Sequence, residues 1–179
     1  MSRPRKIPFR NPPIHFVISV TDDRRFSDDH HEMNFGRTFF VTTVTAARLP
    51  IFRRDPTARL LIETLAHYRN QGKYLLHEFV VMPDHVHLLL TPSDEISLER
   101  VVQLIEGGFS FRLRRGHVWQ QSFTNHRILD FQDFERHREY IRMNPVEAHL
   151  SGVPGAYPYS SAATTVCLDA LAGAEALFK

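Results

Sequence analysis

Cysteine is nearly absent from this chain of 179 residues, which contains only Cys167. A single cysteine excludes an intramolecular disulfide and a zinc site built from several thiolates, and it fits a reducing cytoplasm. Long apolar runs are absent too, because no stretch reaches the roughly 18 apolar residues of a membrane-spanning helix. No apolar signal core follows the basic, proline-rich start at 1–13. We therefore expect a cytoplasmic protein with no membrane partner.

A large excess of charge of one sign is also missing. The formal net charge is +2 and the sequence pI is near 8.9, which is too mild to establish nucleic-acid binding. What the sequence does contain is clustered arginine, as at Arg112, Arg114 and Arg115, together with eleven histidines. Arginine suits bidentate phosphate contacts, although such clusters are also typical of a solvated surface. The hydrophobic content of 42% predicts a globular domain with a real core.

The chain divides into three parts by its residue patterns. We predict an N-terminal extension over 1–35, a compact domain over 36–161 and a C-terminal tail over 162–179. β-Branched and aromatic residues predict four strands in the domain, and residues 14–20 form a further candidate in the extension. The four predicted strands span residues 37–45, 73–82, 85–92 and 126–131.

Three helices are predicted between and after these strands. They begin at Asp55-Pro56, at Ser97 and at Asp130, where proline or a capping side chain precedes apolar residues at helical spacing. Gly107-Gly108 argues against an unbroken second helix, and Pro145 predicts that the third stops at Asn144. The order of elements predicts an α+β fold of ferredoxin-like type, with an antiparallel or mixed sheet and helices packed on one face.

Two histidines stand two residues apart on a predicted strand. Side chains at i and i+2 point to the same face, so His85 and His87 lie side by side while Val86 faces the core. Two neutral imidazoles can hold one divalent cation and leave positions open for water or a phosphate oxygen. The alternative is a pair of surface histidines, and the apolar strand around them favours the metal site.

Tyr140 lies on the third predicted helix, on a side shared with Arg136, His137 and Asn144. The apolar residues of that helix point elsewhere, so Tyr140 is predicted to occupy a polar face. A half-exposed tyrosine at the edge of the core is the alternative. Asn144 follows one turn later, where its carbonyl oxygen can complete a metal shell.

An aromatic and polar stretch follows the second helix. Trp119 and Gln120 stand near His126 and Arg127, and these side chains could stack on and hydrogen-bond an unpaired base. An ordinary packed tryptophan is the alternative reading of Trp119. The predicted DNA-binding set is Arg112, Arg114, Arg115, Trp119, Gln120, His126, Arg127 and Arg136.

Taken in order, these motifs resemble one family, the REP-associated tyrosine transposases of the IS200-like, HUH single-tyrosine superfamily. The resemblance covers about residues 36–161 and rests on His-x-His, Trp-Gln and Tyr-Ile-x-x-Asn-Pro-Val in that order. It implies that His85 and His87 bind the metal, with Asn144 close to it, and that Tyr140 is the nucleophile. It also implies a ferredoxin-like or RRM-like α+β domain with an antiparallel sheet. The cofactor that it implies is Mg²⁺ or Mn²⁺, and the implied partner is single-stranded DNA hairpins, cut through a 5′-phosphotyrosine link.

One position departs from the family pattern, because Glu106 stands where lysine is common. A carboxylate there predicts weaker or different DNA contact. Three other functions stay open: a rolling-circle replication initiator, a hairpin-binding protein that does not cut, and a zinc-stabilised structural domain. The sequence decides neither between a monomer and a homodimer nor which hairpin is bound.

Overall fold

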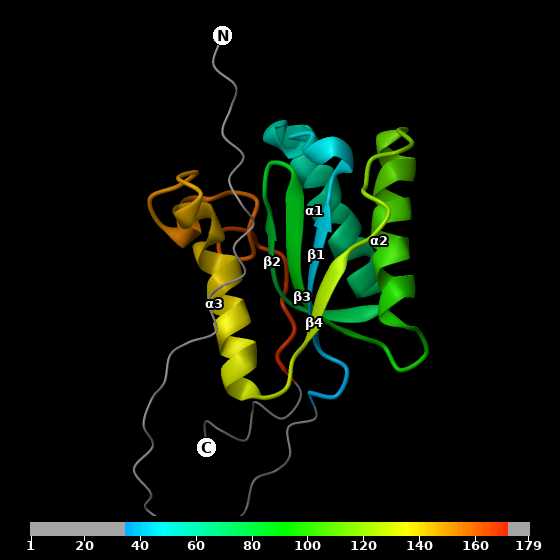
Figure 1. Ribbon diagram of the computed structural model, residues 1–179, viewed down its shortest axis with the longest axis vertical. Coiled ribbons are helices and arrows are strands. Elements are labelled where there is room, and N and C mark those ends of the chain that lie inside the picture. Colours follow the sequence, from blue (N-terminus) through cyan, green and yellow to red (C-terminus); the bar gives the residue numbers. More distant parts are fainter. Residues whose placement is uncertain (1–34, 172–179) are drawn as a thin grey trace, which may run out of the picture. The chain divides into compact units, whose positions relative to one another are not determined.

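The computed structural model describes residues 35–171, so the candidate strand at 14–20 lies outside it. These residues form a four-stranded antiparallel sheet in the order β2-β3-β1-β4. The predicted α+β, ferredoxin-like fold class is confirmed (Figure 1). The elements in chain order are β1 (Phe39–Val44), α1 (Asp55–Asn70), β2 (Tyr74–Val81), β3 (His85–Pro92), α2 (Leu98–Leu113), β4 (Thr124–Arg127) and α3 (Phe131–Glu147).

The helices lie on both faces of the sheet, and in this respect the prediction of one covered face was wrong. Helices α1 and α2 pack on one face, while α3 covers part of the other (Figure 1). Alternation along β3 explains the difference. Leu88 and Leu90 point into the core beneath α1 and α2, whereas Leu89 packs with Phe134 and Ile141 of α3. Both faces of β3 are therefore apolar, and each needs a helical layer.

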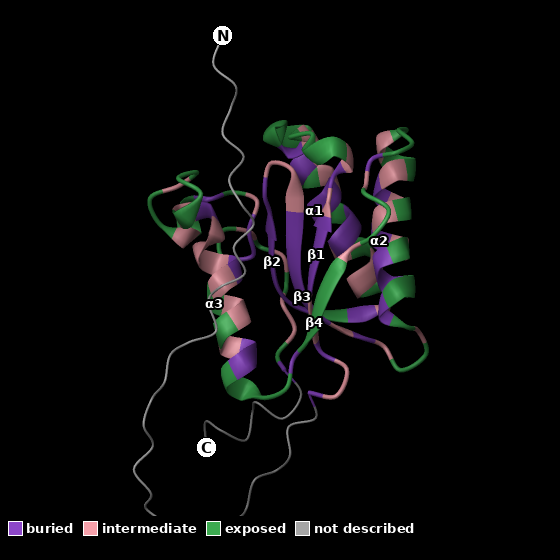
Figure 2. Ribbon diagram, in the orientation of Figure 1, coloured by how far each residue is buried: buried purple, intermediate pink, exposed green. Residues whose placement is uncertain are grey.

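The larger core lies between the sheet and the α1/α2 pair. Its largest fully buried side chains include Phe52, Phe79 and Phe109. Burial falls off toward β4, whose four residues are all exposed (Figure 2). No helix among residues 35–171 is long and apolar enough to cross a membrane.

The predicted helix starts are confirmed. Ser97 and Asp130 cap α2 and α3, because their side chains accept backbone N–H groups of Arg100 and Asp133 at 3.2 and 2.8 Å. The expected break at Gly107-Gly108 does not occur, since α2 is continuous through both glycines. The packing of α1 against α2 explains why glycine stands at position 108. A Cβ there would meet the Tyr68 hydroxyl at 2.5 Å, so glycine lets α1 and α2 approach closely.

Helix α3 continues past the predicted stop at Asn144 and ends at Glu147, with Pro145 inside it. Proline lies in the last turn here, where its ring is buried, so the loss of one N–H group is tolerated. The consequence is functional, because Asn144 stays in helical register one turn after Tyr140.

The outer edge of β2 is covered by residues near the C-terminus. The backbone N–H of Val81 donates to Tyr159 O, that of Ser161 donates to Phe79 O, and that of Asp169 donates to Leu76 O, at 2.8–3.0 Å. Part of the segment that the sequence assigned to a tail thus contacts the sheet. The opposite edge strand β4 begins two residues before the predicted strand and pairs with β1.

Candidate active site

His85 and His87 project from β3 toward the side of the sheet that carries α3. Their ring centroids lie 4.8 Å apart with the rings nearly perpendicular. His87 is buried, with 2% of its surface exposed, while the His85 side chain is 16% exposed. The predicted pairing of two imidazoles on one face is present in this geometry.

Each imidazole is held through its Nδ1 atom. His85 Nδ1 lies 2.6 Å from a carboxylate oxygen of Asp84, which also pairs with Arg48 at 3.1 Å. His87 Nδ1 lies 2.8 Å from the hydroxyl oxygen of Thr42, its partner across the β1–β3 ladder. A proton on Nδ1 leaves the Nε2 lone pair of each ring available to a metal ion, and such partners fix both tautomer and ring orientation.

Burial keeps the His87 ring neutral. It lowers the pKa of His87 well below its ordinary value of 6.5, and the neighbouring His85 adds to this, whereas Asp84 opposes it. The neutral imidazole is the form that binds a metal ion. The candidate dyad is therefore ready to bind metal at neutral pH without first losing a proton from His87.

Tyr140 faces this dyad rather than an outer polar surface. Its ring lies 5.3 Å from the His87 ring and 5.7 Å from the Phe40 ring, so it sits between α3 and the sheet. Burial raises the pKa of the Tyr140 hydroxyl; a hydrogen bond with Asn144 opposes this, and the charge of Glu147 reinforces it. The phenol is thus protonated at neutral pH, and Asn144 lies against its oxygen.

The predicted DNA-binding residues are not gathered on one surface. Arg112 points back to α1, where it pairs with Glu63 and with the Thr64 hydroxyl at 2.9 Å. Arg136 pairs with Asp133 at 3.2 Å but keeps 73% of its side chain exposed. Of the others, Arg114, Arg115 and Gln120 are exposed near the end of α2, and His126 and Arg127 are exposed on β4.

Trp119 is a packed aromatic, the alternative that the sequence left open. Its ring packs against those of Phe52 and Phe109, with centroids at 5.8 and 5.5 Å, and its Nε1–H donates to the Glu106 carbonyl at 3.1 Å. The Glu106 side chain turns toward β1, where its carboxyl accepts the Thr43 hydroxyl. Both residues therefore belong to the α1/α2 side of the sheet.

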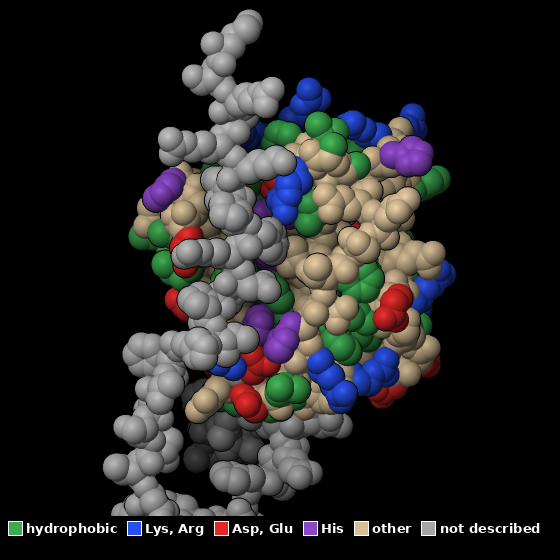
Figure 3. Space-filling view, viewed as in Figure 1, with side chains coloured by type: hydrophobic (Ala, Val, Ile, Leu, Met, Phe, Trp, Pro, Cys, Tyr) green, Lys and Arg blue, Asp and Glu red, His purple; other side chains and the backbone are tan. Residues whose placement is uncertain are grey.

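Exposed arginines gather at the end of the sheet where β2 turns into β3. Lys and Arg side chains cluster along this end in Figure 3. Antiparallel pairing places Val44 opposite His85, so the segments that follow β1 and α2 meet at this end of the sheet. We call this surface the basic end; its exposed residues are Arg48, Arg53, Arg54, Arg114 and Arg115.

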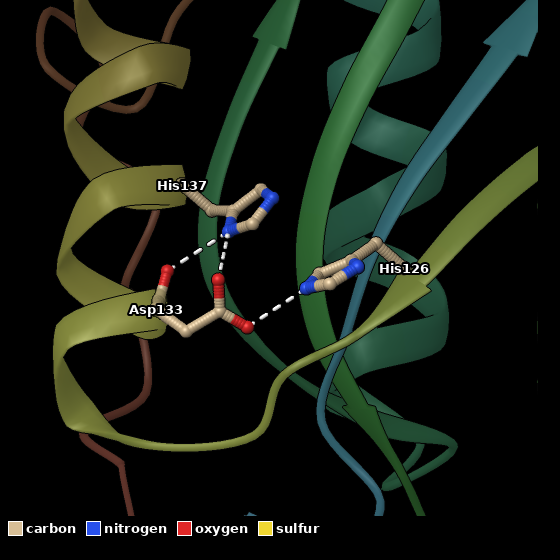
Figure 4. A group of neighbouring side chains, drawn as sticks. All are labelled: His126, Asp133 and His137. Atoms are coloured by element: carbon tan, nitrogen blue, oxygen red, sulfur yellow. Dashed lines mark hydrogen bonds and ion pairs between the residues drawn. The ribbon is translucent and has the colours of Figure 1, made fainter. Parts of the chain in front are cut away.

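A second group of polar side chains lies at the junction of β4 and α3. His126, Asp133 and His137 offer ligand atoms that all lie within 4.8 Å of one another (Figure 4). The His137 ring also lies 4.8 Å from Phe40, which contacts the rings of His87 and Tyr140. These three residues are a possible metal-binding group beside the candidate dyad.

Sequence reasoning did not identify the residues that contact His85, His87 and Tyr140. Thr42 could be found only from the register that pairs it with His87. The spacing of Asp133 and His137, one helical turn apart, was a usable signal for the second group. His126 joins them only through the packing of α3 on the sheet.

The sequence matches the profile of a family described as IS200-like transposases over residues 35–144. A REP-associated tyrosine transposase of Escherichia coli (strain K12) is 23% identical over 127 residues, covering 70% of this chain and 76% of that protein. A solved structure of a REP-associated tyrosine transposase bound to a REP hairpin covers 79% of this chain and 82% of its own, with a TM-score of 0.61 and 22% identity. At this identity, the similarity to that structure shows a shared fold and nothing more.

Proposed function

The chain belongs to the family of IS200-like transposases, which are DNA-processing enzymes, and we propose that it cuts and rejoins single-stranded DNA at REP-like hairpins. Tyr140 is the proposed nucleophile, with His85 and His87 as metal ligands. One observation carries this proposal: the Tyr140 ring meets the His87 ring at 5.3 Å within a single chain. The hairpin substrate is supported by the E. coli relative and by the fold of the hairpin-bound transposase.

The donor set suits a divalent cation of moderate softness. Two imidazoles held through Nδ1, and the side-chain carbonyl of Asn144 one turn after Tyr140, offer nitrogen and oxygen ligands. Imidazole ligands favour Mn²⁺ over Mg²⁺, which prefers oxygen alone. A bound ion supplies positive charge that polarises the scissile phosphate.

The protein's own residues position the substrate and the nucleophile. The basic end lies beside His85 and offers arginine side chains to the phosphates of the strand that enters the site. Phe40 packs edge-on against Tyr140 and stacks on His87, which fixes the phenol relative to the dyad. All of these groups belong to one chain, so a monomer holds the complete proposed site.

The proposed reaction exchanges one phosphate ester for another. Tyr140 Oη forms a bond to phosphorus as the bond to the 3′ oxygen breaks; the phenol loses its proton and the 3′ oxygen gains one. The 5′-phosphotyrosine link keeps the free energy of the phosphodiester, so rejoining to another 3′-hydroxyl needs no nucleotide cofactor. Because the pKa of Tyr140 is raised, cleavage is expected to speed up as pH rises above neutrality.

The test is a covalent-complex assay on the full chain. We would incubate wild type and Tyr140→Phe with Mn²⁺ and labelled single-stranded hairpins from the DNA that flanks the gene, and then look for a protein–DNA band on a denaturing gel. Wild type is expected to give the band, and Tyr140→Phe, His87→Ala or a chelator should abolish it.

Tyr159→Phe is the matched control, because Tyr159 lies away from the dyad and hydrogen-bonds Asp55. It should keep the band. A band that survives Tyr140→Phe would show that another residue attacks. Hairpin binding without any band in wild type would favour a binding protein that does not cut.

A further inference from the structure

His126, Asp133 and His137 connect β4 to the first turns of α3. His126 Nε2 lies 2.8 Å from Oδ2 of Asp133, and His137 Nδ1 lies 3.2 Å from Oδ1 of the same carboxylate. The two imidazole rings stack at 4.8 Å with 19° between their planes. Figure 4 shows both rings directed at the carboxylate, His126 from β4 and His137 from α3.

Asp133 is the fixed centre of this group. Its residue is 4% exposed, and its carboxylate also accepts the backbone N–H of Leu129 at 3.2 Å. Burial alone would raise the pKa of Asp133, but hydrogen bonds from His126 and Leu129 and the charge of His137 together lower it. The group therefore presents an ionised carboxylate that is already oriented between two imidazoles.

We propose that His126, Asp133 and His137 form a second metal site, separate from the His85/His87 dyad, for a divalent transition ion of the zinc class. Imidazole and carboxylate ligands suit Zn²⁺, whose bonds of about 2.0–2.2 Å place tetrahedral ligand atoms roughly 3.3 Å apart. The two ring nitrogens lie 2.8 and 3.2 Å from different oxygens of Asp133, and all three ligand atoms lie within 4.8 Å of one another. A shared ion therefore requires the two rings to shift toward one carboxylate oxygen. Asp133 and His137 lie one turn apart on α3, so both reach the same side of the helix.

The remaining coordination position is open to solvent. The His126 side chain is 46% exposed, so water or another small ligand can reach the ion. His137 Nδ1 also donates to the Asp133 carbonyl at 2.8 Å, so Nδ1 binds metal only in the tautomer that carries its proton on Nε2.

An ion at the second site would hold α3 in place against the sheet. His126 lies on the sheet and the other two ligands lie on the helix, so an ion ties the start of α3 to β4. The Phe40 ring contacts both His137 and Tyr140, at 4.8 and 5.7 Å, which connects this junction to the proposed nucleophile. Metal binding itself depends on neither DNA nor Tyr140, so the proposal stands apart from the proposed reaction.

Zinc binding is best measured after the dyad has been removed. In the full chain carrying His85→Ala and His87→Ala, we expect one equivalent of Zn²⁺ by titration calorimetry and by metal analysis after dialysis. The thermal midpoint should rise with zinc concentration, since an ion that binds the folded state stabilises it. Adding His126→Ala should weaken zinc at least as much as the roughly 10–100-fold loss typical of a second-shell change.

Two further variants keep the test decisive. His137→Gln is measured beside His126→Ala, and both variants should lose zinc. His126 lies on an exposed strand that tolerates substitution, so the His126→Ala variant is expected to fold. His67→Ala removes an exposed helical histidine on α1 and should leave zinc affinity unchanged. If the variant without the dyad binds no zinc, or binds it equally after His126→Ala and His137→Gln, the group is a hydrogen-bonded clamp and the proposal is overturned.

Discussion

The two faces of the sheet are built from different chemistry. Beneath α1 and α2 the core is mainly apolar, with Phe52, Phe79 and Phe109 fully buried, and its buried polar residues include the neutral Thr43 and Thr64. The α3 face buries polar groups instead, His77, Glu78, His87 and Asp133 among them. Burying such groups is costly unless they are hydrogen-bonded, and each of these four has a partner.

The Glu78 carboxylate shows how the polar face is held together. It accepts Nε–H of Arg142, which lies on α3, at 2.9 Å and also pairs with the Ser161 hydroxyl. Paired buried ions contribute little net stability compared with apolar packing. The contrast indicates that the α1/α2 face supplies most of the stability, while the α3 face holds the side chains of the candidate active site in place.

The largest expected effect is on folding. Phe109→Ala, on the apolar face, should lower the free energy of unfolding by about 3–5 kcal/mol, as large-to-small core substitutions do. At temperatures where the variant stays folded, its Mn²⁺ affinity should equal that of wild type, because the dyad faces the other way. Urea unfolding and Mn²⁺ titration measure the two quantities. A large loss of Mn²⁺ affinity in the folded variant would break the division between the faces.

Two adjacent threonines of β1 provide the sharpest version of this comparison. Thr42 bonds His87 on the α3 face, and Thr43 bonds Glu106 on the other. Thr42→Val should weaken Mn²⁺ binding by about 10–100-fold, the usual cost of losing a partner of a ligating histidine. Thr43→Val should leave Mn²⁺ affinity unchanged. Equal affinities in both variants would mean that the dyad does not bind the ion through this arrangement.

Much of the fold followed from local pattern. The caps at Ser97 and Asp130 and the apolar strand at His85–Pro92 are decided by neighbouring residues, which the sequence displays directly. The placement of α3 on the opposite face was missed, because β3 is apolar on both sides and local spacing does not say which helix covers which. The continuation through Pro145 was missed for a similar reason, since tertiary packing overrides the local preference of proline.

The candidate site divides in the same way. Two histidines on one strand, and a tyrosine followed by asparagine one turn later, are visible as spacings in the sequence. Their meeting across the space between β3 and α3 is a tertiary fact, as are the partners Thr42 and Phe40. Trp119 illustrates what local sequence does not decide. A tryptophan can pack in a core or stack on a base, and the sequence does not distinguish the two until its neighbours are known.

The dependence of stability on pH should also separate the faces. Burial lowers the pKa of both His77 and His87 below the ordinary 6.5, so the unfolded chain binds more protons than the folded one in that range. Their contribution is complete above pH 6.5 and is lost as pH falls through the depressed folded values. Without metal, unfolding free energies from pH 8 to 5 should fall less steeply in His87→Gln than in wild type. An unchanged slope would contradict the buried neutral state of His87.

The smallest expected effect is at Glu106, where the pH dependence of stability has the opposite sign to that of the buried histidines. Burial raises the pKa of Glu106 above 4.5, although the Thr43 hydrogen bond opposes this, so its stabilising contribution is present below pH 4.5 and lost as pH rises. Glu106→Gln keeps an acceptor for Thr43 and should raise the free energy of unfolding at pH 7 by less than about 1 kcal/mol, with no gain at pH 4.

The Glu106→Lys variant removes that acceptor and should be less stable than Glu106→Gln. The family's usual lysine led to the expectation that lysine here tightens DNA binding, whereas the geometry turns this side chain toward β1. Hairpin affinities of Glu106→Lys and Glu106→Gln, measured at matched salt, separate these expectations. Equal affinities would assign the residue to the packing of α2 on β1. Tighter binding by the lysine variant alone would place position 106 within reach of a phosphate and would extend the DNA surface onto the α1/α2 side.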